Sequence, residues 1–386
     1  MNSTINRIII KNKKYLFLLA YIMYLAELIF FSSMFGEIEK LQLGFKIIRN
    51  FCYCLILLKV VLDFIFKEFK VKECYLIIII TVFLIVITKN TGNKSILIYW
   101  FFIIAAHDIK LELIVRIALL VHLFCMSIII TSSLMDILQD RIYTRNMNET
   151  RYSIGYQYTT DSSNYFLHMI LMYIYIKKDK ISWEAIGFLG ICNLLLFKIT
   201  DTRSVFFTVT ITLLIVSLLK IFKFLRMNNR LYKTVSTVCV PILSSIILYL
   251  TFSFNSEIQW MNDLNKKINT RLQLGNDAYK TYGLHLLGQN IQWIGGANEY
   301  DAIKKSYNYV DSSYVQIILN FGVLFFILLC IGFIILGRKA AKNNDIYLCL
   351  ILIIISVHSV LDPQLIWMAF NPFILCYSYI HIVDAP

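Results

Sequence analysis

Three arginines stand out because each lies in or beside a polar interval between apolar runs: Arg151, Arg203 and Arg271. The planar guanidinium group of arginine binds two oxygens of a phosphate at once and stays charged. If the three intervals face the same side of a membrane, these arginines could converge on a single anion. The spacing therefore points to a phosphate-bearing ligand.

Each arginine also has a structural interpretation, which stays open from the residues alone. Arg203 lies two residues after Asp201 in "KITDTRSVFF", where the two side chains could form an ion pair. Arg271 lies at the end of a segment with apolar residues at helical spacing, so it could occupy the polar face of an amphipathic helix. Arginines at helix ends can also simply reach back to the interface, which leaves Arg151 equally open.

The elements that would position these residues are membrane-spanning helices. The chain has 386 residues, 58% of them hydrophobic, and a mean hydropathy of +0.67, which is above the range of soluble domains. We expect an all-α, polytopic transmembrane helix bundle of about 12 spans, forming one membrane domain over residues 1–386. The apolar runs fall at about 15–35, 47–66, 75–88, 95–106, 117–136, 165–176, 183–198, 204–222, 235–253, 313–336, 346–361 and 367–383.

The distribution of lysine and arginine orients these spans. Basic residues crowd the N-terminus and the short intervals near residues 67–72, 177–180, 220–233 and 338–342. The positive-inside rule places these intervals and both termini in the cytoplasm of a multi-pass protein of the cell membrane. The net charge of +13 is then explained by loops beside anionic lipid. The basic residues form no patch, so nucleic-acid binding is not expected.

Two longer intervals then face outward, at about 137–164 and 254–312. The larger one carries six bases and six acids. It begins with apolar residues at helical spacing from Ile258 to Leu272, which predict one amphipathic helix on the membrane face. Gly275, Gly283, Gly288, Gly295 and Gly296 would let the rest fold tightly. Its Tyr and Trp residues suit either an interfacial belt or a sugar-binding surface.

The order of these short motifs resembles a known family. "RYSIGY" precedes a span, "DTRS" opens a later one, and "NTRLQLG", "LLGQN" and "VDSSYVQIILNFGVLFFILL" follow in the large outer interval. This order resembles the Wzy-type O-antigen and capsular polysaccharide polymerases of the O-antigen polymerase/ligase superfamily. The family's Asp-Asn-Ser-Tyr reads Asp311-Ser312-Ser313-Tyr314 here.

The resemblance implies a membrane glycosyltransferase that joins oligosaccharide repeat units carried on undecaprenyl diphosphate, with that lipid-linked substrate and membrane lipid as partners, alongside a chain-length regulator and a flippase. Arg151, Arg203, Arg271 and Tyr314 would bind substrate, and Asp311 or His285 would be the base for the attacking hydroxyl. No cofactor or metal is expected. The structural alternatives are that Asp311 caps the next helix and that His285 is a lone loop histidine.

Two other functions stay open. A ligase of the same superfamily tends to carry His-Asn where this chain has Asp311-Ser312. A flippase or transporter of lipid-linked oligosaccharide would concentrate polar residues at mid-membrane. Within the apolar runs, Lys59 and Asp63 are four residues apart and are predicted to pair, whereas Glu27 has no evident local partner.

Overall fold

The computed structural model describes residues 3–145, 149–222, 230–295 and 308–380. These residues are mainly helical, and their one sheet is a two-stranded ribbon. Seven of the described helices are long and apolar enough to cross a membrane, and two shorter apolar helices accompany them. The chain is therefore an all-α protein of membrane character, while the count of about 12 spans stays a prediction.

The chain divides into two compact units, and the single membrane domain over residues 1–386 stays a prediction. Unit 1 comprises Met1–Phe83, Lys94–Thr210 and Met368–Pro386, and unit 2 comprises Leu84–Asn93 and Ile211–Trp367. Two helices contribute to both units: α3 (Val71–Thr91) and α8 (Arg203–Ile221).

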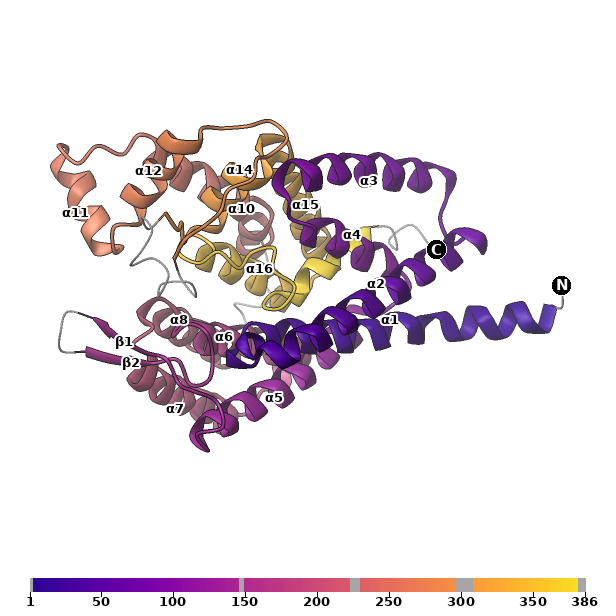
Figure 1. Cartoon of the computed structure of the whole chain (residues 1–386), viewed down its shortest axis with the longest axis horizontal. Coiled ribbons are helices and arrows are strands. Elements are labelled where there is room, and N and C mark those ends of the chain that lie inside the picture. Colours follow the sequence, from indigo (N-terminus) through magenta and orange to yellow (C-terminus); the bar gives the residue numbers. More distant parts are fainter. Residues whose placement is uncertain (1–2, 146–148, 223–229, 296–307, 381–386) are drawn as a thin grey trace. The chain divides into compact units, whose positions relative to one another are not determined.

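Unit 1 is built on the pair α1 and α2, which pack against each other along their length (Figure 1). Helix α5 packs on both α1 and α6, and α4 packs on α2. Besides its parts of α3 and α8, the elements of unit 1 are α1 (Ser3–Phe31), η1 (Met34–Glu37), α2 (Glu39–Ile65), α4 (Ser95–Ala105), α5 (Leu111–Leu134), β1 (Ile142–Arg145), β2 (Glu149–Tyr152), α6 (Asp161–Lys177), η2 (Lys178–Lys180), α7 (Trp183–Thr200) and η4 (Pro372–Ile380).

The connections of unit 1 sort into two sets. Met34 N donates to Gly155 O over 2.9 Å, which joins the α1–α2 and α5–α6 connections. About twenty residues earlier on α1, roughly 30 Å away at 1.5 Å per residue, Lys13 contacts Glu68 of the α2–α3 connection. The α5–α6 connection and the α2–α3 connection therefore contact the α1 region at two places about 30 Å apart.

Unit 2 is built on α10, which packs against both α15 and α16. At one end of α10, helix α12 packs across its last turn. The elements of this unit are α10 (Arg230–Phe252), α11 (Gln259–Lys267), α12 (Arg271–Tyr282), α14 (Ser313–Phe321), α15 (Val323–Lys342) and α16 (Ile346–His358).

The amphipathic segment of the interval 254–312 is two helices rather than one. Asn269 and Thr270 both have a left-handed backbone, with φ of 55° and 60°, and they separate α11 from α12. Asn265 stabilises the break, because its side-chain oxygen accepts a hydrogen bond from Gln273 N at 3.1 Å. As a result Arg271 is the first residue of α12.

The apolar run 313–336 is also broken, at Gly322, into α14 and α15. Gly322 has a φ of 90°, and a side chain there would collide with the backbone of Gly288 and His285. Val323 N donates to His285 O over 3.0 Å, and Gln289 N donates to Asn320 O over 2.9 Å. Loop residues 285–289 thus take up hydrogen bonds that a continuous helix would have made. Gly296, which we also expected to tighten this interval, lies outside the described residues.

Candidate active site

Arg271 and Asp311 form an ion pair in unit 2, although forty residues separate them in the chain. Arg271 Nε donates to Asp311 Oδ2 over 2.9 Å, and the side chains are 19% and 30% exposed. The pair uses only one of the five N–H donors of the guanidinium. Within the described residues no hydrogen bond joins the two Nη groups of Arg271 to the protein. An anion could therefore bind the Nη edge while Nε stays on Asp311.

Helix α12 holds Arg271 in place through contacts with the end of α10. The side-chain amide of Asn276 donates to both Thr251 O and Phe252 O, each over 3.0 Å. The rings of Phe252 and Tyr279 stack at 4.2 Å. Gly275 packs so closely on Thr251 that a Cβ would lie 2.5 Å from its methyl group. Gly275 is thus required for close helix packing, rather than for a tight turn.

Asp311 is positioned by the residues that follow it. Ser313 N donates to Ser359 O over 3.0 Å, and Ser313 Oγ donates to Asp362 O and accepts from Leu365 N. The N-cap of α14 is Ser312, whose side chain makes no capping bond. The carboxylate of Asp311 is on Arg271, so the capping role that the sequence left open for it is not the one observed.

A second pair of titratable residues, which the sequence analysis missed, belongs to the same part of unit 2. His358 ends α16 and Asp362 follows four residues later, with Nε2 and Oδ2 3.4 Å apart. Both side chains are buried, at 3% and 9% exposure. A histidine and an aspartate four residues apart, at the end of an apolar run, were the available signal. We call Arg271, Asp311, His358 and Asp362 the outer-loop site, after the interval 254–312 that is predicted to face outward.

The surroundings of Asp311 make its carboxyl easier to protonate than a carboxyl that is exposed to water. Burial raises the pKa of Asp311, the Arg271 guanidinium opposes that shift, and the negative charge of Asp362 adds to it. The net direction is upward. A carboxylate of raised pKa in contact with a guanidinium is suited to general-base chemistry beside an anion.

The structure brings Arg271 and Asp311 together but does not join the other expected residues of unit 2 to them. His285 is exposed and, among the described residues, its imidazole makes no hydrogen bond or ion pair. Tyr314 is fully buried, and its hydroxyl donates to Ser356 O over 2.8 Å. Tyr314 thus packs α14 on α16, and Asp311 is the better placed of the two expected bases.

Arg151 and Arg203 belong to unit 1. Arg151 is buried on β2, and its Nε donates to Thr200 O at the end of α7 over 2.8 Å. Arg203 is the first residue of α8, with 53% of its side chain exposed, and its Nε lies 3.3 Å from Asp201 Oδ1. The Asp201–Arg203 pair predicted as a structural alternative is therefore present. Arg151 fixes the turn that carries Arg203.

Unit 1 also contains a buried ion network, which we define as Lys13, Lys59, Asp63, Glu68, His107 and Asp108. Lys59 Nζ lies 2.7 Å from Asp63 Oδ2, which confirms the pairing predicted from their spacing, and 2.9 Å from Asp108 Oδ1. Lys13 Nζ lies 2.8 Å from both Asp63 Oδ1 and Glu68 Oε1. Glu27, for which the sequence showed no local partner, is bound by Arg49 of α2.

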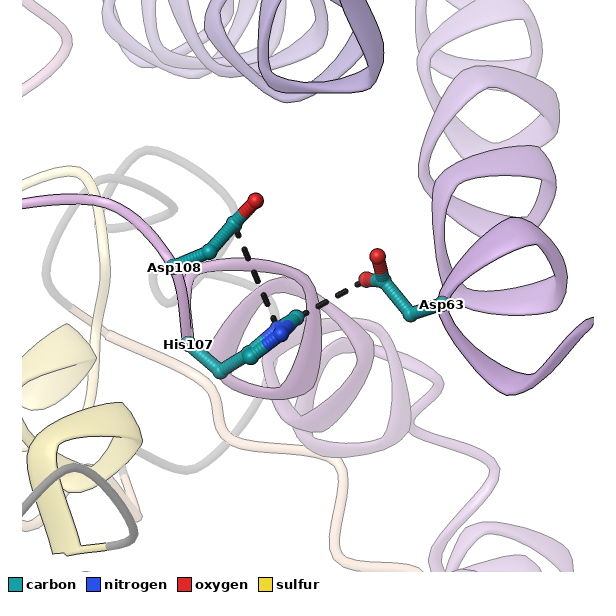
Figure 2. A group of neighbouring side chains, drawn as sticks. All are labelled: Asp63, His107 and Asp108. Carbon is teal, nitrogen blue, oxygen red and sulfur yellow. Dashed lines mark ion pairs between the residues drawn. The ribbon is translucent and has the colours of Figure 1, made fainter. Parts of the chain in front are cut away.

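Three members of the network have the residue types of a metal site. Figure 2 shows Asp63, His107 and Asp108 turned toward one another, with one ligand atom from each within 4.8 Å of the others. However, lysine ammonium groups bind both oxygens of Asp63 and one oxygen of Asp108. A divalent cation would have to displace them against like-charge repulsion. The donor set therefore fits an internally neutralised ion cluster better than a cation site.

Comparison with known proteins finds no matching family model, no similar curated protein and no similar solved structure. The functional case accordingly depends on the residues and contacts described above.

Proposed function

We propose that this protein is an integral membrane glycosyltransferase that polymerises undecaprenyl-diphosphate-linked oligosaccharide repeat units into surface polysaccharide on the outer face of the cytoplasmic membrane. The observation that carries the proposal is the Arg271–Asp311 pair, in which a guanidinium with unused donors touches a carboxylate. Together they supply the two groups that the reaction needs: a cation for the diphosphate and a base for the hydroxyl.

The charge distribution supports an outward position for this pair. Lysines and arginines crowd the N-terminus and alternate short connections, which the positive-inside rule assigns to the cytoplasm. The intervals that hold Arg271, Asp311 and Asp362 are then on the opposite side. A substrate on that side arrives already activated by its diphosphate, since nucleotides are confined to the cytoplasm.

In the proposed step, Asp311 takes the proton of an acceptor sugar hydroxyl. The hydroxyl oxygen attacks the anomeric carbon of the growing chain and forms the new glycosidic bond. The bond from that carbon to the diphosphate oxygen breaks, and its electron pair leaves with the lipid diphosphate. The Nη edge of Arg271 stabilises the charge that develops on the leaving group.

The arginines of unit 1 have separate roles in this proposal. Arg203 is half-exposed at the first turn of α8, where the helix dipole also favours an anion, so it would bind diphosphate. Arg151 is buried and would act indirectly, since its bond to Thr200 O fixes the turn that presents Arg203. A flippase or chain-length regulator would act as a partner that supplies substrate or limits the product.

The two alternatives predict different chemistry. A ligase would transfer a finished glycan to another acceptor, and the Asp311-Ser312 sequence favours polymerase over it. A flippase or transporter of lipid-linked oligosaccharide is favoured by one observation, the buried charges of the ion network in unit 1. Those charges include Glu68 and Asp108 in the connections that follow α2 and α4, whereas transport sites lie at mid-membrane.

The test is the size distribution of the host's surface polysaccharide after deletion of the gene. Complementation uses wild type, Arg271→Ala and Asp311→Ala, with Lys280→Ala and Asp277→Ala on the exposed face of α12 as matched controls. We expect loss of long chains in the deletion and in both site variants, with single repeat units still appearing outside, and long chains in both controls.

Other outcomes would replace the proposal. Repeat units trapped on the cytoplasmic side would identify a flippase. Long chains that remain on their lipid carrier would identify a ligase. An unchanged profile would remove polysaccharide synthesis altogether.

A further inference from the structure

The outer-loop site contains two carboxylates, one paired with an arginine and one beside a histidine. Asp311 has Arg271 at 2.9 Å, whereas Asp362 faces the imidazole of His358 at 3.4 Å. The two carboxylates interact electrostatically, and the charge of Asp362 favours the protonated form of Asp311. The proposed reaction releases a proton at this place.

The backbone fixes the two carboxylates relative to each other. Ser313 Oγ donates to Asp362 O and accepts from Leu365 N, and Ser313 N donates to Ser359 O. Three hydrogen bonds on one residue therefore lock the segment after Asp311 onto the turn that carries Asp362. These bonds are buried, so the arrangement is not a surface accident.

Polar side chains beside this lock have unused hydrogen-bonding capacity. Ser312 Oγ and Gln364 Oε1 are buried and, among the described residues, have no hydrogen-bond partner. Leaving such buried atoms without a hydrogen bond lowers the stability of the folded state. A purely structural turn would gain by replacing them with apolar side chains, whereas a site that handles protons keeps polar groups at this position.

We propose that Asp362 is a second carboxylate of the outer-loop site, a positioning residue that strengthens Asp311 as the base, and that His358 holds Asp362 in place. The inference rests on the proposed function, because it concerns the proton that the acceptor hydroxyl gives up. Asp362 does not touch substrate. Its negative charge stabilises the protonated form of Asp311 and opposes the effect of Arg271. The groups that face Asp311 in this way are Arg271 of α12 and Asp362 after α16.

The experiment measures polymerisation by the purified full-length protein in liposomes, with a lipid-diphosphate-linked repeat unit as substrate, as a function of pH. Wild type is compared with Asp362→Asn, with His358→Gln and with the exposed control Asp277→Asn. We expect Asp362→Asn to move the acidic limb of the rate profile down by about one pH unit, the scale of shift that a neighbouring charge gives. His358→Gln should move it in the same direction by less, and the control should leave it in place.

A second readout does not depend on activity. The carboxyl of Asp311 is titrated by ¹³C NMR in detergent with labelled aspartate, its signal being assigned as the one that Asp311→Asn removes. The same downward shift in Asp362→Asn is expected.

If wild type polymerises but neither the acidic limb of the rate profile nor the NMR signal moves, the role of Asp362 is wrong and the proposed function stands. If wild type makes no polymer in liposomes and the NMR signal does not move, both fail. If it makes none but the signal moves, the coupling of the two carboxylates stands without the polymerase.

Discussion

The two charged clusters of this protein use the same residue types differently. In the buried ion network of unit 1, both oxygens of Asp63 are bound by ammonium groups, at 2.8 Å from Lys13 and 2.7 Å from Lys59. In the outer-loop site of unit 2, Arg271 spends a single donor on Asp311, and Asp362 faces an imidazole. The first cluster neutralises itself, whereas in the second the Nη groups of Arg271 make no hydrogen bond within the described residues.

This difference indicates which cluster can do chemistry. Buried ions that are fully paired contribute little beyond holding helices in register, but they cost several kcal/mol when one partner is removed. A site that must bind an anion and accept a proton needs groups that are held in place but keep hydrogen-bonding capacity for the substrate. Substitutions should therefore affect folding in unit 1 and activity in unit 2.

The largest effect should follow Asp63→Asn. This substitution removes the carboxylate shared by two buried lysines, so the free energy of unfolding should fall by about 3–5 kcal/mol. Denaturation in detergent, followed by tryptophan fluorescence, measures it. The matched control is Glu112→Gln in an exposed i,i+4 pair with Arg116, which should change stability by less than about 0.5 kcal/mol. Equal effects for Asp63 and Glu112 would remove the distinction between a structural network and a surface pair.

The next largest effect should follow Arg271→Lys. Lysine keeps the charge but cannot contact Asp311 and two phosphate oxygens together, so polymerisation should fall by roughly 10²-fold, as for loss of one transition-state donor. Stability should change little, because both side chains are partly exposed. Lys280→Arg on the same helix is the control. Full activity with Lys at 271 would mean that the site needs only a point charge there.

Some of this arrangement is evident from the sequence. The pairing of Lys59 with Asp63 follows from their spacing on one helix, whereas the outward position of the arginines, inferred from the charge pattern, stays a prediction. His358 and Asp362 have the same spacing but were not predicted to pair, because a single histidine in an apolar run is usually a buried structural residue. The spacing of four residues was therefore enough to predict both pairs, although only the pair of Lys59 and Asp63 was predicted from it.

The remaining contacts depend on chain segments that meet only in the folded state. Asp108 contacts Lys59 from 49 residues away, and Asp311 contacts Arg271 from 40. The break at Gly322 depends on loop residues 285–289, which supply partners for its backbone. Hydropathy alone gives a continuous span at 313–336, since it contains no information about a loop that packs against that run.

A smaller effect concerns pH and unit 1. Burial lowers the pKa of His107, the Lys59 and Lys13 charges act in the same direction, and Asp63 and Asp108 oppose them. The folded-state pKa is thus below the unfolded value of about 6.5. Above pH 6.5 the imidazole is neutral in both states and stability is unaffected. As pH falls from 6.5 toward the lowered value, the unfolded state binds the proton first, and stability declines.

Unfolding at pH 7.5 and 5.5 measures this effect. The wild-type protein should lose stability at the lower pH, and His107→Gln should lose less. The contribution of the carboxylates to the pH dependence is the same in both proteins. It therefore cancels when the loss of stability in His107→Gln is subtracted from that in the wild type. An identical pH dependence in the two proteins would show that the decline has another origin.

The smallest stability effect should follow Arg203→Ala, and it tests the comparison within unit 1 itself. The ion pair with Asp201 is partly exposed, so its loss should lower the free energy of unfolding by at most about 1 kcal/mol. If Arg203 binds diphosphate, the same substitution should raise KM for the lipid-linked substrate about tenfold or more, the cost of one charge-assisted hydrogen bond of 1.5–3 kcal/mol. Asp201→Asn keeps Arg203 but removes its partner, and it should leave KM unchanged or lower. Equal KM values for wild type and Arg203→Ala would reduce Arg203 to a surface ion pair and leave the anion to Arg271.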